Sequence, residues 1–343
     1  MERKLASIRI IKDILPIPDS DNIELAVVDG WQSVVKKGEF NIGDKVIYCE
    51  VDSVLPEKPE YEFLRKSSWN PRYKGFRLRT IRLRGAISQG LILPLLEDFE
   101  HYDEGTDVTE FMEIVKYELP PERGGNSNGR CRARDNFPYF IPKTDEERIQ
   151  NLKWNSHYYD AYKDNIFYIT EKIDGQSSTF YIKDGSFGVC SRNFDLEDDD
   201  NTFWNIARKY DIETKLRKLE KNIAIQGEIY GLKIQDNKYD LQEIVLAVYN
   251  VYDIDNMKYY DYIDFKAIVG KLGLETVPII NDSFILKKDM REMILMADGN
   301  SVINKSIPRE GLVIRPVKEL WDTRDGRISF KCISNEFLLK FKA

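Results

Sequence analysis

Short runs of β-branched and aromatic residues, separated by turn formers such as Asp29-Gly30 and Lys37-Gly38, dominate the first hundred residues. The runs cover residues 26–28, 33–35, 45–51, 78–83 and 85–93. Apolar residues do not alternate strictly between 78 and 83, so we expect a bulge or a change of strand near Ile81. Five short antiparallel strands are typical of a small closed β-barrel of the OB type, although a β-sandwich gives the same pattern.

From residue 137 onward, runs of strand length alternate with segments of helical spacing. Strands are expected at residues 166–170, 178–182, 223–228, 245–249 and 311–315, and helices at 201–219 and 262–272. This mixture predicts an α+β domain built on two antiparallel sheets. Thr144 and Glu147 have capping-box spacing, so a helix is expected to start within residues 142–148, where Lys143 and Arg148 could hold a phosphate.

A segment rich in Gly, Asn and Pro divides the chain. Residues 120–130 have almost no apolar side chains, as expected of a flexible linker. A chain of 343 residues suits two domains. We therefore predict an OB-type domain over residues 1–120, a linker over 121–136 and a second domain over 137–343.

Composition narrows the class of protein. The chain has 51 basic and 58 acidic residues, 42% hydrophobic residues and only two histidines. It has no apolar run long enough for a membrane span and no apolar signal core at its start, which favours a cytoplasmic or nuclear protein over a secreted or membrane protein. The four cysteines form no CxxC pair, and with so few histidines a zinc site or histidine-based catalysis is not expected.

One segment departs from the acidic average. Residues 63–84 contain no acidic side chain and carry eight basic ones, interleaved with aromatic rings: Arg65, Lys66, Arg72, Lys74, Arg77, Arg79, Arg82 and Arg84. Cations suit phosphates and aromatic faces suit bases, so this composition favours a nucleic-acid-binding surface. The same run also fits a solvated strand face whose aromatic residues belong to the core.

A series of polar residues stands at the edges of apolar runs in the second part of the chain. The sequence Lys172-Ile173-Asp174-Gly175 follows one predicted strand and precedes another, and alone it is a weak signal. In order, it is followed by Ser191-Arg192-Asn193, Gly227-Glu228, Val251-Tyr252-Asp253-Ile254, Glu310-Gly311 and Phe330-Lys331.

This ordered series resembles the covalent nucleotidyltransferase superfamily of polynucleotide ligases and mRNA capping enzymes. The resemblance implies a nucleotidyltransferase (ATP-grasp-like ligase) domain and ATP as cofactor. It implies that Lys172 is the nucleophile that takes AMP, that Arg192 contacts the ribose and phosphate, and that Glu228 binds the ribose. It further implies that Tyr252 stacks on the purine, and that Glu310 and Lys331 contribute the fourth motif and the α-phosphate contact. Glu171 and Ile173, which flank the nucleophile, complete the expected nucleotide site.

The order of the domains indicates which family within this superfamily the chain resembles. DNA ligases and capping enzymes of this superfamily carry an OB domain after the last lysine motif, whereas only 12 residues follow Lys331 here and the barrel precedes it. That order is similar to the fifth family of ATP-dependent RNA ligases, nick-sealing enzymes with an amino-terminal OB domain. The sequence departs from the Lys-x-Lys ending of many RNA ligases, because position 333 is Ile333, and Lys340 is a possible replacement.

The expected chemistry can be argued from the residues as well. A lysine amine attacks phosphorus only when it is neutral, yet a free lysine titrates near ~10.4. A divalent cation whose water ligands are held by carboxylates would lower that pKa, and we assign Asp174, Glu228 and Glu310 to this role. A set of hard oxygen ligands selects Mg²⁺ or Mn²⁺. In-line attack also requires a grip on the departing pyrophosphate, which the resemblance assigns to the OB side and for which Lys143 and Arg148 are the local candidates.

We therefore predict an ATP-dependent RNA ligase of RNA repair, acting as a monomer on a nicked duplex with an RNA 3′-hydroxyl end. Three alternatives stay open. A DNA ligase would not require a ribonucleotide at the 3′ side of the nick, and a guanylyltransferase would be labelled by GTP instead of ATP. A non-catalytic OB-type nucleic-acid binder is disfavoured because the whole set of motif residues is present: Lys172, Asp174, Arg192, Glu228, Glu310 and Lys331.

Overall fold

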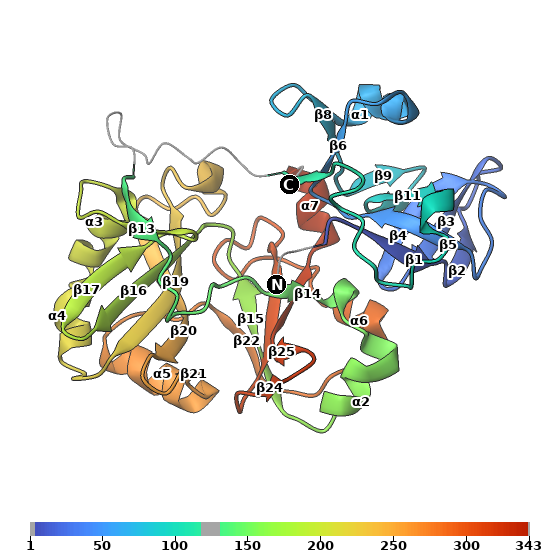
Figure 1. Cartoon of the computed structure of the whole chain (residues 1–343). Helices are drawn as coiled ribbons and strands as arrows, with labels where there is room; N and C mark the ends of the chain where they lie inside the picture. The colour runs from blue at the N-terminus through green and yellow to red at the C-terminus, as the bar shows by residue number, and fades with distance from the viewer. Residues whose placement is uncertain (1–3, 118–130, 342–343) are drawn as a thin grey trace. The chain divides into compact units, whose positions relative to one another are not determined.

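The computed structural model describes residues 4–117 and 131–341, and the chain divides into two compact units (Figure 1). One unit comprises residues 1–120 and 335–343, and the other comprises residues 121–334. The sequence analysis assigns residues 335–343 to the second domain, but the structure groups helix α7 (Asn335–Phe341) with the first unit. There Gln89 Nε2 donates a hydrogen bond to Asn335 Oδ1 at 3.0 Å.

Most of the predicted linker, residues 121–130, lies outside the described residues. Its last residues form strand β13 (Ala133–Asn136), which pairs with β18 (Phe194–Leu196). The end of the predicted linker is therefore a strand at the edge of a sheet.

The first unit consists mainly of short antiparallel strands. They are β1 (Ala6–Ile10), β2 (Asp13–Pro16), β3 (Ile23–Val28), β4 (Trp31–Lys36), β5 (Lys45–Cys49), β6 (Ser53–Pro56), β7 (Trp69–Asn70), β8 (Gly75–Arg77), β9 (Ile81–Leu83), β10 (Ala86–Ser88), β11 (Leu91–Pro94) and β12 (Val115–Lys116). Short helical segments are η1 (Pro59–Leu64), α1 (Arg65–Ser68) and η2 (Glu97–Phe99). The expected change of strand near Ile81 is confirmed, because β8 and β9 belong to different sheets.

Strand β5 is the centre of this unit. It pairs with β1 on one side and β11 on the other. Successive side chains of a strand point to opposite faces. Accordingly, Ile47 and Cys49 enter one hydrophobic cluster, whereas Val46 and Tyr48 enter another. Because both faces of β5 are buried, its run of apolar residues does not alternate with polar ones.

The second unit contains two large sheets. The seven-stranded sheet has the order β13, β18, β17 (Ser186–Cys190), β16 (Gln176–Lys183), β19 (Ile223–Gly231), β20 (Ile244–Asp253) and β21 (Lys258–Tyr259). The five-stranded sheet has the order β14 (Glu147–Arg148), β26 (Phe330–Ile333), β23 (Gly311–Pro316), β15 (Phe167–Lys172) and β22 (Ile279–Phe284). A hairpin joins β24 (Trp321–Asp322) to β25 (Gly326–Arg327). The expected pair of antiparallel sheets is confirmed, with one parallel pairing between β14 and β26.

Helices pack against both of these sheets. Helices α3 (Thr202–Lys209), α4 (Ile212–Arg217) and α5 (Tyr262–Lys271) pack side chains such as Trp204 and Phe265 into the core of the seven-stranded sheet. Segments η3 (Ile149–Asn151), η4 (Trp154–Tyr158), α2 (Tyr159–Tyr162) and α6 (Met290–Leu295) accompany the five-stranded sheet. The helices predicted at 201–219 and 262–272 are confirmed, but the first is divided into α3 and α4 at Asp211, whose φ is 50°.

The helix start predicted within residues 142–148 is wrong. Residues 142–146 are irregular, and Glu147 and Arg148 form β14. The Thr144 hydroxyl hydrogen-bonds to Ser177 Oγ at 2.8 Å instead of capping a helix. The Glu146 carboxylate accepts a hydrogen bond from the buried Arg315 guanidinium at 2.7 Å. These tertiary contacts outweigh the local capping pattern, so no helix N-terminus is available there for a phosphate.

Within the described residues, none of the helices has both the length and the apolar character that crossing a membrane requires.

Candidate active site

Lys172 is the last residue of β15, opposite Gly311 on the neighbouring strand β23. Glu310 immediately precedes β23, and the Lys172 Nζ atom donates a hydrogen bond to Glu310 Oε1 at 2.6 Å. The two side chains are 28% and 15% exposed, so most of the ion pair is withdrawn from water. The preceding residue, Glu171, points to the opposite face of the strand, where its Oε2 atom accepts the N–H of Val302 at 2.7 Å.

Three carboxylates act on the charge of Lys172. Burial alone would lower the pKa of the Lys172 ammonium, but Glu310, Glu228 and Asp174 together outweigh it and raise that pKa. Burial raises the pKa of Glu228 to about 8, against the opposing effect of Lys172. Burial also raises the pKa of Glu310, again against Lys172. The structure therefore brings the predicted nucleophile and the three predicted carboxylates together.

The turn after β15 carries Asp174 and Gly175. The Asp174 N–H donates to Tyr239 Oη at 2.8 Å, and the Asp174 carboxylate forms an ion pair with Lys238 at 2.6 Å. Gly175 is a position of close approach, because a Cβ there would clash with the carbonyl oxygen of Ile229 and lie 2.9 Å from Glu228 Cγ. A larger residue would push the turn away from the strand that carries Glu228.

Lys331 lies on the same sheet as Lys172. It stands opposite Val313 on one side and opposite Arg148 on the other. Its positive charge lowers the pKa of Glu310, which places it near the Lys172 ion pair. Ile333 stands opposite Gly311 and is buried, so the second lysine of a Lys-x-Lys ending is replaced here by an apolar contact.

Arg192 extends from the other sheet. Its Nη2 atom donates to both carboxylate oxygens of Asp145 at 2.6 Å, and its charge lowers the pKa of Glu228. Lys143 Nζ donates to Asn193 Oδ1 at 3.5 Å, whereas Arg148 is buried in β14. Lys143 and Arg192 are thus exposed cations near Asp145, Lys143 on the segment that crosses the seven-stranded sheet and Arg192 in the connection between β17 and β18.

The structure does not bring Tyr252 to the Lys172 cluster. Its ring is 3% exposed, lies edge-on to Tyr259 and belongs to a hydrophobic cluster with Ile141 and Tyr181. No ring face of Tyr252 is open to a ligand. The tyrosine beside Glu228 is Tyr249, whose pKa is raised by burial and by the Glu228 charge and whose hydroxyl hydrogen-bonds to Ser177.

The carboxylates fit a cation that is held through water. In the part of the chain that the structure describes, no three His, Cys, Asp or Glu side chains converge closely enough to bind a metal ion directly. However, the Glu310 Oε2 atom is buried without a hydrogen-bond partner, and it belongs to a set of hard oxygen donors. Such an atom can accept from a water ligand of Mg²⁺ or Mn²⁺.

Comparison with known proteins agrees with this geometry. Residues 165–333 match the family model described as RNA ligase, and residues 5–95 match one described as OB-fold domain. The comparison with curated proteins gave no significant match. Among solved structures, the chain is 39% identical to Naegleria gruberi RNA ligase with PPi, with 99% of each chain covered and a TM-score of 0.89. A glutamate-to-alanine mutant of that ligase with ATP and Mn gives 39% identity, 99% and 100% coverage and a TM-score of 0.90. A lysine-to-alanine mutant with ATP and Mn gives 39% identity, 98% coverage of each chain and a TM-score of 0.88.

The chain belongs to the RNA ligase family. The predicted fold class, an OB-type barrel followed by a nucleotidyltransferase domain, is confirmed, and so is the prediction of an RNA ligase. An RNA ligase acts on a nucleic-acid substrate. The roles of the individual residues stay a prediction, which the geometry above now constrains.

The basic segment of this RNA ligase is only partly free for a substrate. Three of its cations are half-buried: Arg65 pairs with Glu57 and Glu62, Arg77 pairs with Asp52, and Arg79 donates to the Ser67 carbonyl oxygen. The five exposed cations are Lys66, Arg72, Lys74, Arg82 and Arg84. Trp69 and Phe76 pack into the core region, as expected if the aromatic residues of this segment belong to the core, and nucleic-acid binding by the exposed cations stays a prediction.

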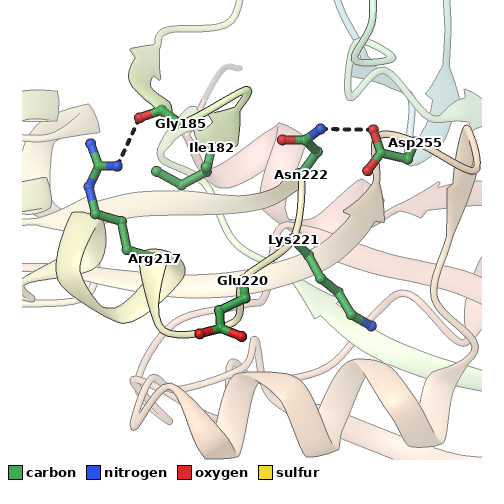
Figure 2. A pocket seen from close by; sticks show the side chains of 7 residues that line it. All are labelled: Ile182, Gly185, Arg217, Glu220, Lys221, Asn222 and Asp255. Carbon is green, nitrogen blue, oxygen red and sulfur yellow. Dashed lines mark hydrogen bonds between the residues drawn. The ribbon is translucent and has the colours of Figure 1, made fainter.

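A cavity of about 430 Å³ lies at the far end of β16 from the Lys172 cluster (Figure 2). Its lining residues are Ile182, Gly185, Arg217, Glu220, Lys221, Asn222 and Asp255. Ile182 pairs with Ile223 at one end of the β16–β19 ladder, whereas Ser177 pairs with Glu228 near the other. None of the predicted site residues lines this cavity. Arg217 already donates to the Gly185 carbonyl oxygen, and Asn222 donates to Asp255.

Two of the contacting residues, Lys238 and Tyr239, were not among the predicted site residues. They lie in the loop between β19 and β20, where a lysine and a tyrosine among polar residues form no recognisable motif. Only the folded structure brings them to Asp174, which is 64 and 65 residues earlier.

The raised pKa of Glu228 predicts a pH-dependent stability. Because the pKa is about 8 in the folded protein and ~4.3 in the unfolded chain, the stability that Glu228 contributes at low pH is lost as pH rises towards 8. Glu228→Gln should therefore melt at a higher temperature than the wild type at pH 8, by about 2–4 °C for each kcal/mol of stability gained, with little difference at pH 4.5. The exposed Glu220→Gln is the matched control. A difference between Glu228→Gln and wild type that stays constant over this range would contradict the prediction.

Proposed function

We propose that this RNA ligase seals nicks with a 3′-hydroxyl and a 5′-phosphate through a lysyl-AMP intermediate on Lys172. The observation that carries the proposal is the largely buried Lys172–Glu310 ion pair, at 2.6 Å, with the carboxylates of Glu228 and Asp174 nearby. An arrangement in which acidic groups outnumber the lysine is suited to bind a cationic cofactor and, with it, the anionic ATP. Two Naegleria gruberi RNA ligase structures contain ATP and Mn, which supports the same cofactors here.

The nucleophile must lose its proton before it reacts. In the unliganded protein, the surrounding carboxylates favour the ammonium form of Lys172. Asp174, Glu228 and Glu310 are the residues that would hold the water ligands of Mg²⁺ or Mn²⁺. The bound ion supplies positive charge, which favours the neutral amine and balances the charge that builds on the α-phosphate. With such an ion bound, its water ligands would replace the Lys172 ammonium as the hydrogen-bond partner of Glu310.

The reaction proceeds in three in-line displacements at phosphorus. Lys172 Nζ attacks the α-phosphorus of ATP, forming a P–N bond as pyrophosphate leaves. The 5′-phosphate of the polynucleotide then attacks the lysyl-AMP phosphorus, which breaks the P–N bond and transfers AMP to the strand. Finally, the 3′-hydroxyl attacks the activated 5′-phosphate, forming the phosphodiester and releasing AMP.

Cationic residues around Lys172 stabilise these steps. Lys331 lies on the strand next to β23, near Glu310, and is assigned to the α-phosphate. Arg192 is half-exposed near Glu228 and is assigned to the ribose and phosphate. Arg148 stands opposite Lys331, and Lys143 is exposed, which supports a role for both in holding the pyrophosphate. Tyr249, beside Glu228, replaces Tyr252 as the aromatic residue proposed to be nearest the nucleotide.

The proposal also covers the oligomeric state, the cellular compartment and the substrate of the ligase. We propose that the ligase acts as a monomer. The described cysteines Cys49, Cys131, Cys190 and Cys332 are free thiols, in keeping with a cytoplasmic or nuclear compartment. The substrate is a nicked duplex whose 3′-hydroxyl end is RNA.

Lys172→Ala should abolish covalent labelling of the denatured protein by ATP labelled in its α-phosphate, because it removes the amine that pairs with Glu310 at 2.6 Å and is proposed to attack the α-phosphorus. Lys172→Met should also remain unlabelled but retain ATP binding, which separates the loss of the nucleophile from the loss of the pocket. The exposed Lys218→Ala is the matched control and should label like the wild type. Labelling of Lys172→Ala at the wild-type level would show that another residue takes the nucleotide.

Substrate choice can be measured with two nicked duplexes that differ only in the nucleotide at the 3′-hydroxyl side of the nick. An RNA ligase of this kind should seal the nick with a 3′-ribonucleotide at least ten times faster than the nick with a 3′-deoxynucleotide. Equal sealing rates for the two duplexes would favour a DNA ligase activity.

The exposed cations Arg82 and Arg84 should contribute to binding the duplex through its phosphates. Arg82→Gln/Arg84→Gln should weaken binding and reduce the slope of log K against log salt by about one to two units. Lys36→Gln/Lys37→Gln, on an exposed turn of the same unit, makes the same change in charge and serves as control. An unchanged slope in the arginine variant would indicate that these two arginines belong to a solvated strand face and do not bind the duplex.

A further inference from the structure

The loop between β19 and β20 has an unusually strained backbone. Five of its non-glycine residues have positive φ angles: Lys233, Gln235, Asp236, Asn237 and Asp240, with values between 46° and 64°. Asn and Asp adopt a left-handed conformation readily, but at Lys233 and Gln235 it is costly and persists only where surrounding contacts enforce it. The structure contains such contacts, because Ile234 and Tyr239 are buried and the Asn237 side chain bonds to Leu241 in both directions.

This loop holds the turn after the predicted nucleophile through three contacts. Tyr239 Oη accepts the Asp174 N–H at 2.8 Å, and Gln235 Nε2 donates to the Gly175 carbonyl oxygen at 3.4 Å. Lys238 Nζ forms an ion pair with Asp174 Oδ2 at 2.6 Å. The Lys238 and Asp174 side chains are 13% and 20% exposed. The strained loop is thus built against the two residues that follow Lys172-Ile173.

The second acceptor of Lys238 belongs to the loop itself. Lys238 Nζ also donates to the Gln235 carbonyl oxygen at 3.0 Å. The backbone of Lys238 is fixed in turn, since its carbonyl oxygen accepts from Asn304 Nδ2 at 3.4 Å. A lysine held in this way can release Asp174 and retain a hydrogen-bond partner, because its flexible stem lets the ammonium move while the backbone stays in place.

We propose that Lys238 is a positioning residue that neutralises the Asp174 carboxylate in the unliganded ligase and gives way to a divalent cation when the nucleotide site is filled. The inference rests on the proposed function, which assigns Asp174 to the cation. Without nucleotide, two of the three carboxylates are paired with lysines, Glu310 with Lys172 and Asp174 with Lys238. The ammonium of Lys238 keeps Asp174 oriented and limits repulsion among the acidic groups, at the cost of competing with the cation.

A purely structural ion pair predicts a different behaviour. Removing one partner of a half-buried pair that serves only stability weakens the fold and leaves cation affinity unchanged or reduced. A lysine that competes with the cation gives the opposite sign, because its removal leaves Asp174 available. The two roles are therefore separated by a measurement of cation affinity that does not depend on ligation.

The test is a titration with Mn²⁺ alone, followed by electron paramagnetic resonance of the free ion. The full-length ligase is first treated with pyrophosphate to remove any bound AMP. Lys238→Met should bind Mn²⁺ about 3–10 times more tightly than the wild type, whereas Lys238→Arg, which keeps the charge, should bind like the wild type. Lys233→Met, on the same loop but exposed, is the matched control and should not change the affinity.

Two results would overturn the proposal: Mn²⁺ affinity of Lys238→Met at or below that of the wild type, or an equal gain in Lys238→Arg and Lys238→Met. If Lys238→Met does not fold, Lys238→Gln makes the same change in charge and is judged by the same outcomes. Adding Asp174→Asn to Lys238→Met should remove the gain, which assigns the effect to this carboxylate. The titration uses no ATP, so it does not depend on lysyl-AMP formation. Absence of lysyl-AMP in a separate labelling assay of the wild type would contradict the proposed function, whereas the Mn²⁺ affinities would still test the role of Lys238.

Discussion

The proposed active site depends on one largely buried charge cluster, the ammonium of Lys172 among the carboxylates of Glu310, Glu228 and Asp174. Transfer of charged groups out of water is costly unless opposite charges meet. The Lys172–Glu310 pair, at 2.6 Å, meets that requirement for two of these groups. Glu228 forms no ion pair of this kind within the described residues, and burial raises its pKa to about 8. In the unliganded site the buried Glu310 Oε2 atom has no hydrogen-bond partner in the same part of the chain, and a hydrated cation bound with its nucleotide can satisfy it.

The two sheets of the second unit build this charge cluster from the end of β15, the start of β23 and the interior of β19. Lys172 and Glu310 come from adjacent strands of one sheet, whereas Glu228 comes from the other. Gly175 allows the connecting turn to lie against the strand of Glu228, and the strained loop that contains Lys238 fixes the same turn from the opposite side. Each acidic group is thus positioned by backbone that cannot easily move, which is the preorganisation that charge stabilisation in catalysis requires.

The sequence allowed prediction of the strands and of the residues at their ends, because both follow from local patterns. Lys172, Glu228 and Glu310 each stand beside a buried apolar run, and the structure places them together. The helix start at Thr144 failed because the decisive partner of Glu146 is Arg315, 169 residues further along the chain. Lys238 was missed for the same reason, since its contact with Asp174 is set by tertiary structure and not by any local pattern. The enclosure of Tyr252 by Ile141 and Tyr181 likewise depends on how a distant segment crosses the sheet.

The central claim is that the Lys172 Nζ atom itself carries the nucleotide. The most direct measurement is peptide mass spectrometry of the wild-type ligase after reaction with ATP and Mn²⁺ without polynucleotide. The account predicts a single AMP adduct, fragmented to Lys172 and removed when pyrophosphate is added. An adduct on another lysine, such as Lys331 or Lys238, or the absence of any adduct on an active ligase, would contradict it.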